Sequence, residues 1–168
     1  MRPLQALTLT IALFGCQNAP EISSCQPDGP EFYRYEDKAS GERMTITREG
    51  QRLLFDFHIP EADYRPSKVE AEILEDDNHI RIANLLIPKD LSGEPVLSAT
   101  AKCDVRLSGA RENLYRVVCN YSHEKASEVV LLSIEKGIVE WSTLDEDGSK
   151  VSDYVLRSES GLFHTCVA

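Results

Sequence analysis

Two runs with a period of two residues constrain this chain more than any other feature. Over residues 97–107 the odd positions are apolar or small and the even positions are polar, and over residues 115–121 the odd positions are Tyr115, Val117, Cys119 and Tyr121. Such period-two alternation predicts strands with one buried face. The intervening stretch S-G-A-R-E-N is typical of a turn. Folded as a hairpin, the two strands place Cys103 opposite Cys119, near the separation that a disulfide needs.

The same hairpin register places Val105 opposite Val117 and Leu107 opposite Tyr115. Shorter alternating runs separated by turn residues continue along the chain. Asp147-Gly148 is a hairpin signal, because glycine tolerates a positive φ, and this turn places Trp141 opposite Tyr154. The runs predicted as strands are Met44 to Arg48, Leu53 to Ile59, Ser67 to Leu74, Ile80 to Leu86, Val130 to Ile134, Val139 to Trp141 and Tyr154 to Leu156, with weaker ones at Phe32 to Tyr35 and Leu162 to Val167.

These segments predict an all-β fold, an antiparallel meander of about ten strands that closes as a small barrel or sandwich and is stapled by disulfides. An open sheet of that length would leave two unpaired edges and one bare face. The chain length of 168 residues is typical of one domain, so we expect these strands to form a single domain.

The first sixteen residues have the architecture of a signal peptide. Arg2 supplies a positive start, and a short apolar run follows from Leu4 to Phe14. The run is too short to cross a bilayer as a permanent helix. The sequence Leu13-Phe14-Gly15-Cys16 resembles the lipobox of bacterial lipoprotein signals, although that family prefers a smaller residue at Phe14.

The resemblance implies cleavage before Cys16 and attachment of acyl chains to that residue. Several acyl chains suffice for stable anchoring. Gln17 is not the aspartate that favours inner-membrane retention in enteric bacteria, so the resemblance indicates an outer-membrane lipoprotein facing the periplasm. Residues 17–30 are rich in Pro, Ser, Gly and Asn and are typical of a tether. The predicted organisation is a signal peptide over 1–15, an anchor and tether over 16–30, and one β domain over 31–168.

Five cysteines are present. With Cys16 assigned to lipid and Cys103 paired with Cys119, we expect Cys25 and Cys166 to pair by elimination. An even set of remaining cysteines is typical of disulfides in an exported protein. The cysteines lack the spacing of a zinc site, and no other metal or cofactor is expected.

The net charge of −10 argues against a nucleic-acid partner, because binding phosphates requires clustered Lys and Arg. The four histidines, His58, His79, His123 and His164, stand in no ligand or nucleophile motif. Acidic stretches at 75–78 and 145–149 are interpreted as solvated turns. The second differs from a calcium loop, because it lacks glycine at the sixth position and has Leu156 at the twelfth.

We therefore expect a non-enzymatic binding or interaction module that the acyl chains on Cys16 hold at the membrane. One alternative is an inhibitor of a cationic protein such as lysozyme. Another is a barrel that holds a small apolar ligand. A large apolar cavity would favour that barrel, and a core filled by Phe55, Phe57, Trp141 and Tyr154 would argue against it.

Overall fold

The computed structural model describes residues 29–59, 67–83, 85–91, 95–97, 101–108, 113–122 and 125–164. Twelve antiparallel strands form one sheet across these segments. They are β1 (Glu31–Asp37), β2 (Arg43–Glu49), β3 (Arg52–His58), β4 (Ser67–Glu75), β5 (His79–Ile82), β6 (Leu85–Pro88), β7 (Val96–Leu97), β8 (Ala101–Leu107), β9 (Leu114–Tyr121), β10 (Ser127–Ser133), β11 (Gly137–Leu144) and β12 (Lys150–Leu156). No helix occurs in this part of the chain.

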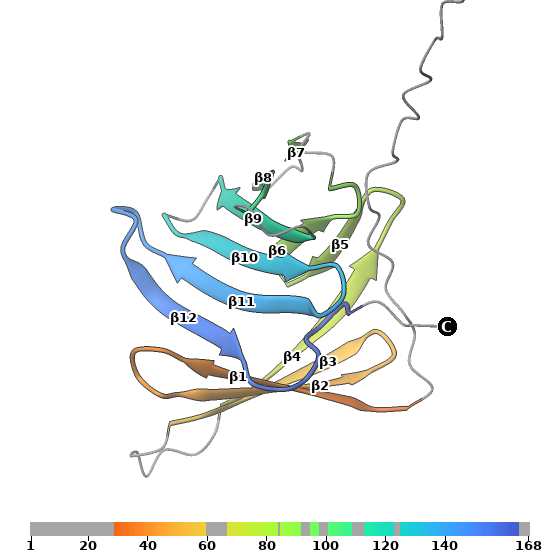
Figure 1. The fold of residues 1–168 in the computed structure, drawn as a ribbon, viewed down its shortest axis with the longest axis vertical. Helices are drawn as coiled ribbons and strands as arrows, with labels where there is room; N and C mark the ends of the chain where they lie inside the picture. Colours follow the sequence, from red (N-terminus) through yellow and green to blue (C-terminus); the bar gives the residue numbers. More distant parts are fainter. Residues whose placement is uncertain are drawn as a thin grey trace, which may run out of the picture.

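The sheet curls into a nearly closed barrel, which confirms the predicted all-β class. β1 to β4 form one wall and β8 to β12 form the facing wall (Figure 1). The sheet edges are β6 and the two-residue β7, and β6 packs against β8 and β9 to bring the seam together. At the seam, the Sγ atom of Cys119 lies 3.1 Å from the carbonyl oxygen of Leu86 on β6.

The predicted hairpin registers are confirmed. Cys103 is the cross-strand partner of Cys119, and the two form a disulfide with a Cα–Cα distance of 4.1 Å. Trp141 is likewise the partner of Tyr154. Their side chains lie inside the barrel because alternate residues of a strand face the same side. Fully buried residues such as Ile46, Val117 and Leu132 form the core between the two walls.

The predicted single strand over 97–107 is wrong. Leu97 belongs to β7, which runs antiparallel to β8 and places Leu97 opposite Lys102. Leu97 is 69% exposed rather than buried. The error has a physical origin: alternation shows which residues share a face, but it does not show where the chain reverses.

The run from Ile80 to Leu86 is also two strands rather than one. β5 and β6 pair directly, with Ile82 opposite Leu85, and Ala83 adopts a positive φ of 49°. This tight reversal lets all four residues of β6 be buried at the seam.

The weak strand predicted to begin at Leu162 is wrong over its described part. Leu162 and Phe163 lie in a turn and are both buried, whereas a strand would turn neighbouring side chains to opposite faces. The turn covers one end of the barrel. There the Tyr35 hydroxyl donates to the carbonyl of Ile138 at 3.0 Å and accepts from the Leu162 amide at 3.2 Å.

Candidate functional site

The opposite end of the barrel carries a pocket lined by aromatic side chains. Met44 lies at the start of β2, and Phe55 and Phe57 occupy alternate positions on β3. Trp141 and Tyr154 face them from β11 and β12. All five side chains point inward and line one pocket. Met44 and Phe57 lie near the ends of their strands, and this places the pocket toward the end of the barrel where β2 begins and β3 ends.

The four aromatic rings contact one another in a chain along the wall of this pocket, from Trp141 through Phe55 and Phe57 to Tyr154. The Phe55 ring packs edge-on against Trp141, with centroids 6.0 Å apart and an interplanar angle of 80°. Phe57 lies 6.3 Å from Tyr154, and Phe55 lies 6.4 Å from Phe57 in a nearly parallel arrangement. These separations are within the range of favourable ring contacts. We call these four residues the aromatic box.

The pocket holds about 280 Å³, and Glu128, Thr143 and Ser152 complete its lining. That volume is at the lower limit of small-molecule sites, which span about 300–1,000 Å³. Phe55 and Tyr154 are buried, whereas Phe57 and Trp141 are only partly covered. The four rings therefore neither fill the core nor surround a large cavity; they form the walls of a small open pocket.

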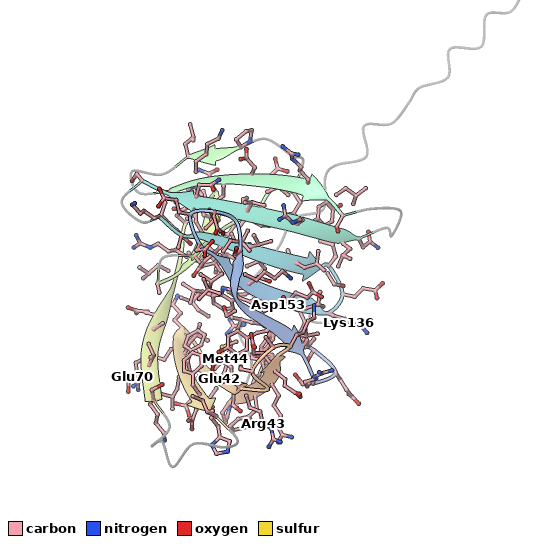
Figure 2. All side chains as sticks on the ribbon, turned by 90° about the vertical axis from the view of Figure 1, so that its left-hand side faces the viewer. Glu42, Arg43, Met44, Glu70, Lys136 and Asp153 are labelled. Atoms are coloured by element: carbon pink, nitrogen blue, oxygen red, sulfur yellow. A yellow bond between two sulfur atoms is a disulfide. The ribbon has the colours of Figure 1, made fainter. Side chains whose placement is uncertain are left out.

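Carboxylates hold two tyrosines at this end of the barrel. The Tyr154 hydroxyl donates to Oε2 of Glu42 at 2.6 Å, and the Tyr121 hydroxyl donates to Oε2 of Glu128 at 2.9 Å. Burial, followed by the hydrogen bond to Glu42, raises the pKa of Tyr154, so its ring remains a neutral phenol. Glu42 and Met44 lie together at the start of β2 (Figure 2).

Asp37 fixes the β1–β2 turn that presents Glu42. Its Oδ1 accepts hydrogen bonds from the Ala39 amide (3.0 Å) and from the amide and hydroxyl of Ser40 (2.7 and 2.9 Å). Its Oδ2 accepts from the Asp153 amide at 2.6 Å. Burial alone would raise the pKa of Asp37, but these hydrogen bonds outweigh it and lower the pKa below its ordinary value.

Asp153 is held in a similar way beside this turn. Its carboxylate accepts from the Ser142 hydroxyl at 2.8 Å and pairs with Lys150 at 2.7 Å. A second cation, Lys38, lies 3.2 Å away. Burial opposes ionisation, yet these partners keep the pKa of Asp153 below its ordinary value. The two ionised aspartates therefore brace β1, β11 and β12 behind Tyr154.

We predict that Asp37→Asn destabilises the protein by about 2 kcal/mol at neutral pH, because the amide nitrogen that replaces one carboxylate oxygen cannot accept a hydrogen bond and the negative charge that strengthens the remaining bonds is lost. A carboxyl whose pKa is lower in the folded state stabilises above its unfolded pKa of about 3.9 and loses that effect as pH falls through the folded value. The difference from wild type should therefore be complete at neutral pH and should shrink as the pH falls below about 3.9 and then through the lower folded pKa of Asp37. Urea unfolding at neutral and at acidic pH measures this difference, with Asp56→Asn, at a partly exposed carboxyl, as the control. A pH-independent difference would contradict the assignment.

The covered end of the barrel holds a second group of polar and charged residues, of which only His164 was singled out from the sequence. Arg48 is buried inside the barrel, with Nε donating to the Gly50 carbonyl at 3.0 Å and its guanidinium 5.9 Å from the Phe163 ring centre. The Tyr33 hydroxyl donates to Glu31, and His164 Nε2 lies 3.7 Å from the same carboxylate. Arg48 follows Met44 and Ile46 at the inward positions of β2, and this alternation could have predicted a buried arginine. These contacts hold the C-terminal turn in place.

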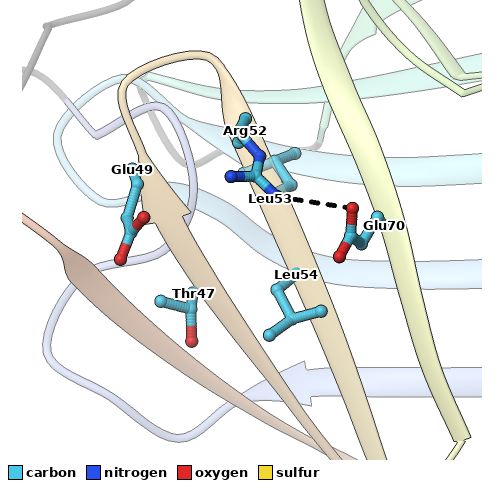
Figure 3. A pocket seen from close by; sticks show the side chains of 6 residues that line it. All are labelled: Thr47, Glu49, Arg52, Leu53, Leu54 and Glu70. Atoms are coloured by element: carbon cyan, nitrogen blue, oxygen red, sulfur yellow. Dashed lines mark hydrogen bonds and ion pairs between the residues drawn. The ribbon is translucent and has the colours of Figure 1, made fainter.

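Other hollows lie on the outside of the barrel. The one in Figure 3 holds about 100 Å³ on the outward side of β2 to β4, next to the exposed pair Arg52–Glu70, whose atoms are 3.4 Å apart. Two larger hollows, of about 450 and 230 Å³, are lined by aliphatic and charged residues of β9 to β12 and contain no aromatic ring. The aromatic box is therefore the better candidate.

The histidines within the described residues do not come together. His58 ends β3, His164 lies at the covered end, and His79 Nδ1 lies 2.8 Å from Asp76 in a turn. The amides of Asn78 and His79 also donate to Asp76, and these bonds lower the pKa of Asp76 to about 2. In the described residues no group of three or more His, Cys, Asp or Glu side chains is placed to hold a metal ion.

The other residues singled out from the sequence, Cys16, Cys25, His123 and Cys166, lie outside the described residues. The lipid anchor and the second disulfide therefore stay predictions. Over the described ranges, no helix has the length and apolar character needed to span a membrane. Comparisons of the chain with protein-family models, with curated proteins and with solved structures yield no match.

Proposed function

We propose that this chain is a non-enzymatic binding protein of the bacterial cell envelope, anchored through acyl chains on Cys16, and that the aromatic box is its binding site. The observation that carries the proposal is the convergence of four rings on one open pocket. A concave, mainly apolar surface with a few polar groups is the usual form of a small-ligand site.

The exposure of inward-facing apolar side chains supports this proposal. Val69 lies opposite Phe55 on the inner face of β4, yet it is 50% exposed. Phe57 and Trp141, which line the pocket, are also only partly buried. Each 100 Å² of apolar surface that stays in water lacks roughly 2.5 kcal/mol of the stabilising free energy that burial would provide. A ligand bound in the pocket would recover part of that free energy by covering the Phe57 and Trp141 rings.

We predict that Phe57→Ala weakens ligand binding about tenfold or more while the fold survives, because this ring is a partly covered wall of the pocket. Calorimetric titration of the full-length protein against a panel of small apolar and cationic molecules measures the effect. Phe32→Ala is the matched control, since Phe32 is 61% exposed on β1 and lies outside the pocket lining. Equal affinities for the two variants, or no ligand from the panel for wild type, would overturn the proposal.

Membrane attachment has its own test. We expect Cys16→Ser to abolish labelling by radioactive fatty acid and to release the protein from the membrane fraction, because the acyl chains would have no attachment atom. Cys25→Ser is the control, because it removes a neighbouring cysteine but not the predicted acceptor. Unchanged membrane partition of Cys16→Ser would sink the anchor prediction.

Inhibition of a cationic protein is a second candidate function. It is favoured by the net charge of −10 and by the acidic residues Asp145, Glu146 and Asp147 in the loop that follows the pocket residue Thr143. Opposite charges would steer such a partner toward this end of the barrel. A pull-down with lysozyme at low salt tests the lysozyme case, and absence of binding there would remove it.

A further inference from the structure

The aromatic box combines two features that recognise the same chemical group. Its rings line one pocket, and their planes are turned in several directions, with interplanar angles of 12°, 58° and 80°. Glu128 lines the same pocket, and none of the other lining residues, Met44, Phe55, Phe57, Trp141, Thr143, Ser152 and Tyr154, is cationic. Ring faces and a carboxylate both attract positive charge.

A second negatively charged group lies next to the rings of the pocket. The Tyr154 hydroxyl donates to Glu42 at 2.6 Å, which places a second carboxylate next to the box. Donation to a carboxylate makes the phenol ring more electron-rich, which strengthens its attraction for a cation. A neutral apolar ligand would contact the rings, but it would take Glu128 partly out of water without bringing a charge of its own to that carboxylate.

On the basis of the proposed function, we infer that the aromatic box binds a quaternary ammonium group carried by a small organic solute. Such a group combines a positive charge with an apolar methyl surface and has no N–H donor that would need a partner. Clusters of aromatic rings are a recurrent way to bind it. Size fits as well: a protein cavity of about 150 Å³ holds benzene, and this pocket holds about 280 Å³.

The test compares choline with 3,3-dimethyl-1-butanol, called dimethylbutanol below. This analogue has the same shape, but a carbon atom replaces the charged nitrogen. Full-length protein in an uncharged maltoside detergent is titrated with each by calorimetry. We expect choline to bind about tenfold or more tightly than the analogue, which is the effect of a partly desolvated cation–π contact. Glycerophosphocholine, as a third ligand, represents a lipid headgroup; if it binds more tightly than choline, the source is lipid and the inference of a free solute fails.

Glu128→Gln tests the carboxylate while keeping an oxygen that can accept the Tyr121 hydrogen bond. We expect it to weaken choline binding roughly three- to tenfold and to leave the analogue unaffected. Glu70→Gln is the matched control, because the Glu70 side chain is 71% exposed on β4, apart from Glu42 and Met44 in Figure 2. Equal losses in both variants would overturn the role of Glu128.

The outcomes separate this inference from the proposed function. If choline and dimethylbutanol bind equally, or if only the uncharged analogue binds, recognition of a cation is wrong and the pocket remains a binding site. If neither binds but another molecule of the panel does, the inference fails and the proposed function stands. If no molecule binds, both fail.

Discussion

Replacing Gly161 by alanine is expected to destabilise the protein by roughly 3 kcal/mol or more. A Cβ atom at Gly161 would lie 2.1 Å from the carbonyl oxygen of Ile138 and 2.9 Å from the Tyr35 hydroxyl. The first of these neighbours is backbone at the start of β11 and cannot swing aside. The C-terminal turn must therefore move away from the barrel end.

Movement of that turn would expose two buried side chains, Leu162 and Phe163, which are 0% and 2% exposed. Burying each such side chain contributes about 1.5–3 kcal/mol. The turn would also lose the hydrogen bond between the Leu162 amide and the Tyr35 hydroxyl. For a chain of this size, the melting temperature should fall by about 6–12 °C, at 2–4 °C per kcal/mol.

Thermal and urea unfolding followed by circular dichroism measure the Gly161→Ala effect. Gly29→Ala is the matched control, because a Cβ there has no atom within 4 Å and the backbone is not left-handed. Its stability should stay within about 0.5 kcal/mol of wild type. If Gly161→Ala unfolds at the same urea concentration as Gly29→Ala, the C-terminal turn does not close this end of the barrel.

Removing the hairpin disulfide should cost about 3 kcal/mol. The two cysteines are separated by 16 residues in sequence, and the chain-entropy model gives about 3 kcal/mol for a loop of roughly that size. The double variant Cys103→Ala/Cys119→Ala removes the link without leaving an unpaired thiol. Both sulfurs lie in residues that are 0% exposed, beside the seam where Cys119 contacts Leu86, so a small cavity adds to the loss.

Urea unfolding of the double variant and of wild type measures this cost, and Cys25→Ala/Cys166→Ala provides the comparison with the second predicted pair. Mass mapping without reduction should give the Cys103–Cys119 peptide pair and also Cys25–Cys166. A loss below about 1 kcal/mol for the hairpin pair would contradict its role as a staple.

Much of the fold could be predicted because period-two patterning fixes both burial and register. Cys103, Val105 and their partners on β9 lie where alternation and turn position place them. The reversal after Leu97 was missed because Leu97 continues the apolar positions of β8 in the sequence. The reversal after Ile82 was missed because only two residues separate Ile82 from the next apolar run, which begins at Leu85. The C-terminal turn was missed because burial of two consecutive residues, Leu162 and Phe163, has no strand or helix period.

The sequence predicted which residues of the candidate site face inward, but it did not predict that they line an open pocket. Alternation places Phe55, Phe57, Trp141 and Tyr154 on inner faces, and the pairing of Trp141 with Tyr154 follows from the turn between them. Whether inner faces pack tightly or stay open depends on how the two walls approach each other across the barrel. That approach is set by contacts between distant segments, such as the one between Phe55 and Trp141, which local patterns do not encode.

The most direct test of an open binding pocket uses Trp141, which is the single tryptophan of the chain. Its fluorescence is titrated with the neutral quencher acrylamide, with and without saturating ligand from the calorimetric panel. We predict substantial quenching in the free protein and protection when ligand is bound, because the ligand occupies the space beside the indole ring. A tryptophan that acrylamide cannot reach in the free protein, with no change on adding ligand, would show a filled core and contradict the account.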